Sequence, residues 1–527
     1  MRIDPAWLRP DAFPDAPAGA RVELVETHVS WVMLVGDRAY KLKKPVSLGF
    51  LDFSTVEERR RACEAELVLN RRLAPDVYLS VEPVTRDAEG RPRVGGDGLP
   101  IDFVVRMRRL DERTRADARV ESGTLGLADV DALAARVASF HAACRSDAET
   151  AAFGAPDAIR FNVEENFAQT GAWRAQAITA REAEEIAEWQ RAFLAEHAAR
   201  FEARAARGFV RDGHGDLRLE HVYFGEAGVT VIDCIEFADR FRFADTCADV
   251  AFLSMDLAWH GRTDLAERLL ARYAMFANDY DLYGLVDFYE AYRAFVRGKI
   301  ALIGANDASA DAARRERALG EARRYLLLAL SADRAALLRP VVVAVGGIIA
   351  SGKSTLADRV ASHLGAPVVE ADRTRKHMLG VLPTTRVSGG AWAGAYDLAF
   401  TERVYDEVLR RAECVLASGR PVVIDASFRT RAMRASARAL AARHGVPLRF
   451  VECRVPIDTV RARLGRRERE GGVSDARLAI LDDFLSKVEP VTELAADEHV
   501  VIDTSGTPEQ SLGAVERVVA TWPERLA

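Results

Sequence analysis

Apolar side chains alternate with polar ones in short runs over the first hundred residues, which is the pattern of antiparallel strands. β-Branched and aromatic residues occupy positions 29–35 and 38–43, and the turn signal Gly36-Asp37 lies between them, so this stretch predicts a hairpin. Residues 11–19, rich in proline and alanine, predict an extended lead-in without burial. The other elements expected here are a charged amphipathic helix at 55–73 and strands at 77–84 and 101–107.

The pattern becomes helical after about residue 130, where apolar side chains recur at three- and four-residue spacings. A short strand-rich stretch at 209–237 interrupts the helices, which then continue to about residue 338. An apolar run at 341–345 next opens a buried strand of the parallel type. We therefore predict two domains, at 1–335 and 340–527, with their boundary near 335–340.

The composition is that of a globular protein with a sizeable core, since 49% of the 527 residues are hydrophobic and 29% are charged. The formal net charge of −6 gives no overall attraction to nucleic acid or to anionic membranes. No run reaches the roughly 18 apolar residues that cross a bilayer. The six cysteines are scattered without a C-x-x-C pair, which argues against a zinc site or a disulfide framework. We expect a cytoplasmic protein without membrane or nucleic-acid partners, and the oligomeric state stays open.

A complete Walker A pattern, G-x-x-x-x-G-K-S, lies between the strand at 341–345 and a helix expected at 355–364. Such a turn aims backbone N–H groups at the phosphates of a nucleotide without side-chain clutter. Lys353 is expected to reach the β- and γ-phosphates, and the Ser354 hydroxyl to complete a Mg²⁺ shell of water and phosphate oxygen. The alternative is a chance match, which the flanking strand and helix oppose. The residues predicted to bind ATP here are Gly347, Ile348, Ile349, Ala350, Ser351, Gly352, Lys353, Ser354 and Thr355.

Acidic residues follow two further strands of this domain. Residues 422–425 form a buried strand that ends in Asp425, where a carboxylate can hold Mg²⁺ or its water shell. Asp372 and Arg375 follow the strand near 368–370, so that a carboxylate able to accept a hydroxyl proton lies beside a cation. The alternative for Asp372 is a helix N-cap, a common place for aspartate.

Five arginines lie in one predicted helix after Pro456. Such a run can close over the phosphates and stabilise the charge that is transferred, and we assign this catalytic role to Arg466 and Arg469. The alternative for each arginine is a solvated helix face.

At these residues the domain resembles the branch of P-loop proteins that holds small-molecule and polynucleotide kinases, zeta toxins, gluconate kinases and chloramphenicol phosphotransferases. In that branch an aspartate after the second strand deprotonates or orients the acceptor hydroxyl. The resemblance implies this role for Asp372 and covers about residues 338–527.

A second group of residues lies in the first domain, at His214-Gly215-Asp216 and Ile232-Asp233. Protein-kinase chemistry uses one aspartate to orient the substrate hydroxyl and another, after the next strand, to bind Mg²⁺. Asp216 and Asp233 fit these two roles. A lone His-Gly-Asp is also a common turn, but the paired acids and the preceding sheet strengthen the kinase interpretation.

This segment resembles the aminoglycoside phosphotransferase-like kinases, and the whole chain resembles the bacterial family that fuses such a domain to a P-loop kinase. The residues that carry the second resemblance include runs at 26–32, 40–46, 49–55 and 233–237. It implies an α+β, two-lobed protein-kinase-like domain followed by an α/β P-loop NTPase domain with a parallel sheet. It also implies that Lys41, or its rival Lys43, contacts the α- and β-phosphates and pairs with Glu66 or Glu64. A solvated surface pair is the alternative.

One position departs from that family. An asparagine that helps to hold Mg²⁺ usually lies five positions after the catalytic aspartate, and His221 stands there instead. A neutral imidazole can bind a cation, but Mg²⁺ prefers oxygen, so His221 is a poorer metal ligand.

We expect from the sequence an ATP- and Mg²⁺-dependent kinase whose P-loop domain phosphorylates a hydroxyl of a small molecule. The kinase-like domain either phosphorylates a second hydroxyl or acts without turnover. Two alternatives remain, an ATP-binding sensor and a polynucleotide 5′-hydroxyl kinase.

Overall fold

The computed structural model describes residues 3–47, 51–307, 310–330, 340–385, 387, 394–470 and 481–518. The chain packs as two compact units, of which the first is Met1–Ala266 with Phe288–Ala332 and the second is Glu267–Asp287 with Asp333–Ala527. The expected boundary near 335–340 falls largely on residues 331–339, outside the described residues. The domain limits 1–335 and 340–527 therefore stay predictions.

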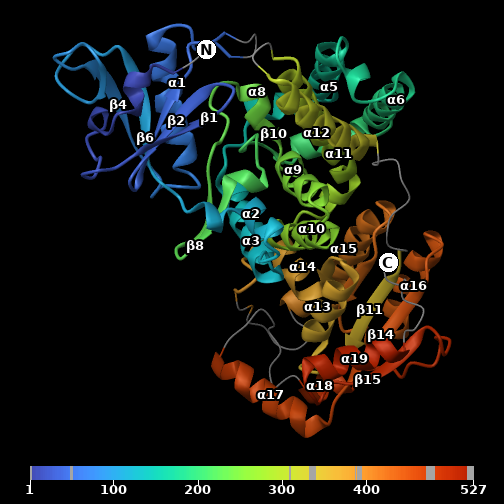
Figure 1. The fold of residues 1–527 in the computed structure, drawn as a ribbon. Coiled ribbons are helices and arrows are strands. Elements are labelled where there is room, and N and C mark those ends of the chain that lie inside the picture. Colours follow the sequence, from blue (N-terminus) through green and yellow to red (C-terminus); the bar gives the residue numbers. More distant parts are fainter. Residues whose placement is uncertain are drawn as a thin grey trace. The chain divides into compact units, whose positions relative to one another are not determined.

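The first unit begins with a six-stranded antiparallel sheet in the order β1-β2-β3-β6-β4-β5, drawn in blue in Figure 1. Helix α1 (Val56–Asn70) contributes Cys63 to a core with Val105 and Met107 of the sheet. The predicted hairpin, helix and strands are confirmed. The strands are β1 (Val22–Glu26), β2 (Ser30–Val35), β3 (Arg38–Lys43), β4 (Tyr78–Arg86), β5 (Pro92–Val94) and β6 (Asp102–Arg108).

The expectation of an extended, unburied lead-in at 11–19 is wrong. A short 3-10 helix covers Pro10–Ala12, and Ala12 and Phe13 are buried in one core with Trp7 and Tyr40. The Tyr40 hydroxyl donates a hydrogen bond to Asp15 at 2.8 Å. Aromatic side chains spaced too irregularly to show a period therefore bury this segment against the sheet.

The rest of the first unit is mainly helical. Helix α9 is buried along most of its length, and two small antiparallel ribbons pair β7 with β10 and β8 with β9. These strands are β7 (Val210–Asp212), β8 (Val222–Gly225), β9 (Gly228–Val231) and β10 (Phe243–Asp245). The helices are α2 (Ala116–Glu121), α3 (Leu127–Ala143), α4 (Ala148–Ala152), α5 (Pro156–Thr170), α6 (Ala180–Glu196), α7 (Ala198–Ala206), α8 (Asp239–Arg242), α9 (Thr246–Trp259), α10 (Thr263–Ala277), α11 (Val286–Ala305) and α12 (Ala312–Leu330).

The second unit is built on a five-stranded parallel sheet in the order β12-β13-β11-β14-β15. Helices and strands alternate along the chain, so the sheet carries an α/β fold and its strands read as nearly continuous apolar runs. Its strands are β11 (Val342–Gly347), β12 (Val368–Glu370), β13 (Val422–Asp425), β14 (Leu448–Arg454) and β15 (His499–Asp503). Its helices are α13 (Lys353–Leu364), α14 (Ala371–Met378), α15 (Leu398–Ala417), α16 (Arg431–Arg443), α17 (Ile457–Glu470), α18 (Leu481–Leu485) and α19 (Pro508–Val518). The fold expected for both parts of the chain is confirmed.

The segment Glu267–Asp287, distant in sequence from the rest of the second unit, is fixed to it by polar contacts. Arg420, just before β13, pairs with Glu267 and with Asp287, each at 2.9 Å. The Tyr280 hydroxyl donates to the Val368 carbonyl of β12 at 2.6 Å. The second unit therefore includes a helical segment that interrupts the first unit in the sequence.

Among the described residues, no helix combines the length and the apolar character that a membrane span requires.

Candidate functional site

The Walker A loop follows the central strand β11 and leads into helix α13 (Figure 1). Gly347 has φ 136° and Gly352 has φ 93°, backbone conformations that glycine adopts without strain. A Cβ on Gly347 would lie 2.6 Å from the Cys453 carbonyl oxygen of β14, so no side chain fits there. Ala350 keeps a left-handed φ of 57° without being glycine, a local strain of the kind that gathers at functional sites.

Lys353 and Ser354 begin helix α13, where the positive end of the helix dipole favours an anion. The Lys353 ammonium donates to the Ile348 carbonyl at 2.9 Å, so it lies over the loop that is expected to hold phosphates. Ser354 is exposed at the first turn. Both residues lie at the start of the helix that follows the loop, and their roles toward a nucleotide stay predictions.

Two residues outside the motif support the loop from behind. Thr504, after β15, donates its hydroxyl to the Ser351 carbonyl. Arg463 of α17 donates to the Thr504 carbonyl at 2.7 Å and to the Ala350 carbonyl at 3.4 Å. The sequence assigned the catalytic role to Arg466 and Arg469; Arg463 of the same helix donates to the loop, and Val460 and Leu464 pack against Ala350. Arg466 is exposed, the Arg469 side chain lies outside the described residues, and their roles stay predictions.

Three acids gather at the carboxyl end of the sheet. Asp425, the last residue of β13, is 7% exposed and is paired in register with Glu370 of β12 and with Val345 of β11. Burial raises the pKa of Glu370 to about 7; Arg373 opposes this effect, and the charges of Asp425 and Asp372 add to it. Sequence reasoning missed Glu370, although its position at the end of a strand was a readable signal.

Asp372 lies in the first turn of α14, one residue beyond its start. Glu370 holds the N-cap position instead, and no side chain caps this helix. The N-cap alternative for Asp372 is therefore wrong, while its role toward the acceptor stays a prediction.

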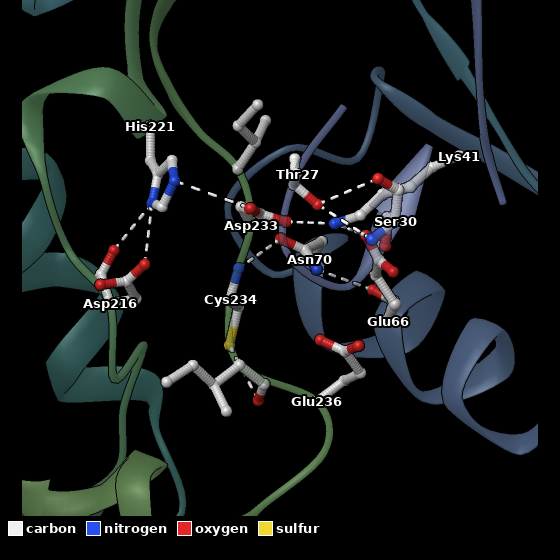
Figure 2. Close-up of polar contacts among 12 residues, drawn as sticks. Thr27, Ser30, Lys41, Glu66, Asn70, Asp216, His221, Asp233, Cys234 and Glu236 are labelled. Atoms are coloured by element: carbon white, nitrogen blue, oxygen red, sulfur yellow. Dashed lines mark hydrogen bonds and ion pairs between the residues drawn. The ribbon is translucent and has the colours of Figure 1, made fainter. Parts of the chain in front are cut away.

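In the first unit, Lys41 and Lys43 of β3 both pair with Glu66 of α1, and Figure 2 shows Lys41 beside Glu66. The Lys41 ammonium lies 2.8 Å and the Lys43 ammonium 2.6 Å from the Glu66 carboxylate, which is fully buried. Glu64 is exposed and pairs with Arg60 instead. Of the two glutamates left open by the sequence, Glu66 thus faces the lysines, and both lysines reach it.

Each lysine also contacts one acid that follows β9. Lys41 contacts Asp233 (Figure 2), and Lys43 contacts Glu236. Burial opposes ionisation of Asp233, but Lys41 and His221 outweigh it and lower the pKa of Asp233 below its usual range. Asp233 has a left-handed φ of 66°, and its N–H donates to the Tyr78 hydroxyl at 3.2 Å. Glu236 lies in the run 233–237, which carried the family resemblance, and the sequence assigned it no role. The structure places it among the site residues.

Asp216 lies on the loop after β7 and accepts two hydrogen bonds from Arg218, at 2.9 and 3.1 Å. Burial raises the pKa of Asp216, but the charges of Arg218 and His221 outweigh burial and lower it to about 2. Sequence reasoning missed Arg218, because nothing in the spacing shows that the arginine folds back onto the aspartate.

His221 bridges the two acids of the first unit (Figure 2). Its Nδ1 lies 2.8 Å from the Asp216 carbonyl oxygen, so this nitrogen carries a proton. Its Nε2 lies 3.6 Å from the Asp233 carboxylate. A terminal nitrogen of Arg218 lies 3.4 Å from the same Nε2, so in the neutral ring Nε2 accepts a hydrogen bond from Arg218 beside the aspartate that is expected to bind the metal.

His214 and Asp249 hold the loop that carries Asp216. Asp249 accepts the N–H groups of His214 and Gly215 at 2.7 and 2.9 Å. His214 Nε2 lies 3.0 Å from the Ile232 carbonyl oxygen, and its Nδ1 accepts the Asp216 N–H at 3.3 Å. Burial lowers the pKa of His214 to about 4, which keeps the ring neutral.

Mg²⁺ fits the residues present only when the nucleotide supplies ligands. Among the described residues, no group of three or more His, Cys, Asp or Glu side chains is arranged to hold a metal by itself. Ser354 with Asp425, and Asp233 with His221, are the predicted metal residues and would each supply part of a shell. Mg²⁺ commonly keeps several waters and phosphate oxygens, so two partial protein shells are compatible with a nucleotide-bound ion.

Comparisons with known proteins cover both units. The family model AAA_33, an AAA domain, matches residues 342–491. The uncharacterized protein Rv2004c of Mycobacterium tuberculosis (strain ATCC 25618 / H37Rv) is 34% identical over 493 residues, which are 93% of this chain and 94% of the relative. The uncharacterized protein Mb2027c of Mycobacterium bovis (strain ATCC BAA-935 / AF2122/97) gives the same values.

Solved kinases resemble separate parts of the chain at low identity. A sugar kinase from Janibacter sp. HTCC2649 is 21% identical, with a TM-score of 0.26, over 35% of this chain and 95% of its own. A choline kinase from Cryptosporidium parvum Iowa II is 10% identical, with a TM-score of 0.37, over 59% of this chain and 89% of its own.

Proposed function

The chain belongs to the family of the mycobacterial proteins Rv2004c and Mb2027c, and from this premise we propose that it is an ATP-dependent phosphotransferase acting on a hydroxyl of a small molecule. The observation that carries the proposal is the complete Walker A loop on the central strand of a parallel sheet, with Asp372 and Asp425 after the neighbouring strands. A phosphate cradle and a proton acceptor at one edge of a sheet are what phosphoryl transfer to an alcohol requires.

In the proposed reaction the acceptor oxygen attacks the γ-phosphorus of ATP. The new oxygen–phosphorus bond forms as the bond to the β,γ-bridging oxygen breaks, and ADP leaves with that electron pair. Asp372 takes the hydroxyl proton, and Lys353 stabilises the charge on the transferred group. When bound, Mg²⁺ neutralises charge on the phosphate oxygens, and Ser354 and Asp425 are the residues that would hold it.

For the first unit, a nucleotide-binding sensor is a second candidate function. Asp216 is held by Arg218 through two hydrogen bonds, and its pKa is lowered to about 2 against the effect of burial, so the carboxylate is a weak proton acceptor. In the catalytic alternative, Asp216 orients the acceptor hydroxyl, Asp233 holds the metal and Lys41 contacts the phosphates.

The experiment is a phosphorylation screen of a metabolite extract with γ-labelled ATP, using the full-length protein. We expect a labelled small molecule with the wild type and with Asp216→Asn, and none with Lys353→Ala. A product that depends on Asp216 and not on Lys353 would move the transferase to the first unit. ATP binding without any labelled product would support the sensor and contradict the transferase.

A further inference from the structure

Arg375 of α14 is a buried cation that lacks a carboxylate partner among the described residues. Its side chain is buried, with the residue 5% exposed, and stacks over the Tyr396 ring at 4.5 Å. One terminal nitrogen donates to the Ala395 carbonyl at 2.5 Å, and Nε is buried without a hydrogen-bond partner in the described part of the chain. Because Arg375 follows Asp372 by three residues on a helix, the two side chains lie on one face.

Arg429 is a second buried cation in the same place, on the loop after β13. The preceding residue, Phe428, has a left-handed φ of 46° although it is not glycine. The Phe428 N–H donates to the Tyr405 hydroxyl at 3.0 Å, and that hydroxyl also lies 3.0 Å from the Ser427 hydroxyl. A strained backbone fixed in this way is typical of a functional site. Arg429 itself is 8% exposed.

This loop adjoins the phosphate cradle directly. The N–H of Gly347, which opens the Walker loop, donates to the Ser427 carbonyl at 3.2 Å. Ser427 and Arg429 are only two residues apart, so Arg429 is held at the same edge of the sheet as the transferred phosphate would be. The two arginines therefore lie on the acceptor side of the proposed reaction.

The two guanidinium groups act on each other electrostatically. Burial lowers the pKa of Arg429; Tyr405 opposes this effect, and the charge of Arg375 adds to it. The charges of both arginines also lower the pKa of the Tyr405 hydroxyl, which burial raises, so both act on the same polar group. Two neighbouring buried cations repel each other, and an anion between them removes that cost.

Other buried arginines of this unit are paired with acids. Arg411 pairs with Glu407 at 2.8 Å, and Arg434 pairs with Glu493 at 2.5 Å. In both cases an acid compensates the buried charge, so these two arginines have a structural role. Arg375 has no such partner among the described residues, and its planar guanidinium suits bidentate contact with a phosphate or a carboxylate.

We propose that Arg375 and Arg429 form an anion-binding subsite of the P-loop domain, and that its acceptor is a small molecule with a phosphate or carboxylate group beside the hydroxyl. The inference rests on the proposed transferase function of the same site and adds the chemical class of the acceptor. Two deeply buried guanidinium groups suit a single anionic group, whereas an extended nucleic-acid backbone requires an open basic groove.

The test is a calorimetric titration of the full-length protein, first with the ATP analogue AMPPNP and then with inorganic phosphate or acetate. AMPPNP occupies the Walker loop, so phosphate can no longer bind there. We expect phosphate or acetate to bind the AMPPNP-loaded protein and Arg375→Gln and Arg429→Gln each to weaken that binding roughly tenfold or more. Arg429→Lys, which keeps the charge, should weaken binding less than Arg429→Gln does. Arg443→Gln removes an exposed arginine of α16 and should change nothing.

The outcomes separate the inference from the proposed function. If AMPPNP does not bind a folded protein, the proposed function fails. If AMPPNP binds but neither anion does, or the two glutamine variants bind anions like the wild type, the subsite is overturned. Phosphorylation of a 5′-hydroxyl oligonucleotide in preference to every small anionic alcohol of the extract would overturn the small-molecule class.

Discussion

Glu370 and Asp425 lie directly opposite each other at the carboxyl ends of the neighbouring parallel strands β12 and β13. Two carboxylates on paired residues of neighbouring strands disfavour each other's ionised form. The pKa of Glu370 is raised, with burial as the first cause, and the charge of Asp425 adds to it. Near neutral pH Glu370 is therefore partly protonated, at the edge of the sheet where Asp372 also lies.

We predict that Glu370 makes the stability of the second unit depend on pH. Its pKa in the folded chain, about 7, lies above the ordinary 4.5. Its stabilising contribution is therefore complete below pH 4.5 and is lost as the pH rises through 7, by up to about 3 kcal/mol. Calorimetry can identify the unfolding transition of the second unit as the one that AMPPNP shifts to higher temperature. In Glu370→Gln this transition should no longer lose stability as the pH rises. An unchanged pH profile in the variant would show that another group is responsible.

We predict that His214 gives the stability of the first unit the opposite dependence on pH. Its pKa is lowered from 6.5 to about 4, so its contribution is present above pH 6.5 and is lost as the pH falls through 4, by up to about 3 kcal/mol. Protonation turns its Nδ1, which accepts the Asp216 N–H, into a donor. His214→Asn should reduce the loss of thermal stability of the first unit at acid pH, measured as the melting temperature at each pH. His444→Asn is the control. Acid sensitivity equal to that of the wild type would refute this account.

We predict that the segment Glu267–Asp287 stabilises the second unit through the ion pairs of Arg420. Arg420→Gln leaves Glu267 and Asp287 without their shared cation, and we expect a loss of about 1–3 kcal/mol in the free energy of unfolding. The loss is measured by urea unfolding, with AMPPNP binding as the readout of the folded second unit. Arg443→Gln should stay within about 0.5 kcal/mol of the wild type. Equal stability of the two variants would mean that the segment contributes no stabilisation through these pairs.

His221→Asn should strengthen Mg²⁺ binding by the first unit. The amide oxygen is a ligand of the type that Mg²⁺ prefers, and we expect affinity to rise on the order of tenfold. Titration of Mg²⁺ with AMPPNP in a Lys353→Ala background reports the first unit, and adding Asp233→Asn should abolish the gain. A fall in affinity would indicate that the imidazole is the better ligand in this site.

The elements and the Walker loop could be predicted because they depend on local patterns. An apolar run, a glycine-rich turn and a helix lie consecutively in the sequence, and the structure confirms that order from β11 to α13. Glu66 was one of two expected partners, and helix phase separates the buried Glu66 from the exposed Glu64.

The missed features depend on contacts between distant parts of the chain. Lys43 meets Glu236 across 193 positions, and no local pattern predicts which lysine of a strand meets which acid. Arg463 meets the Thr504 and Ala350 carbonyls across 41 and 113 positions of the sequence. The assignment of Glu267–Asp287 to the second unit depends on polar pairs such as Arg420 with Glu267, which composition does not reveal.

The central claim is that the second unit transfers phosphate to a hydroxyl with Asp372 acting on the acceptor. The most direct measurement compares Asp372→Asn with the wild type in AMPPNP affinity and in the rate of label transfer to the acceptor found in the extract. The account predicts unchanged nucleotide affinity and a transfer rate lower by roughly 10²–10⁴. An Asp372→Asn variant that binds nucleotide and keeps the full transfer rate would contradict it.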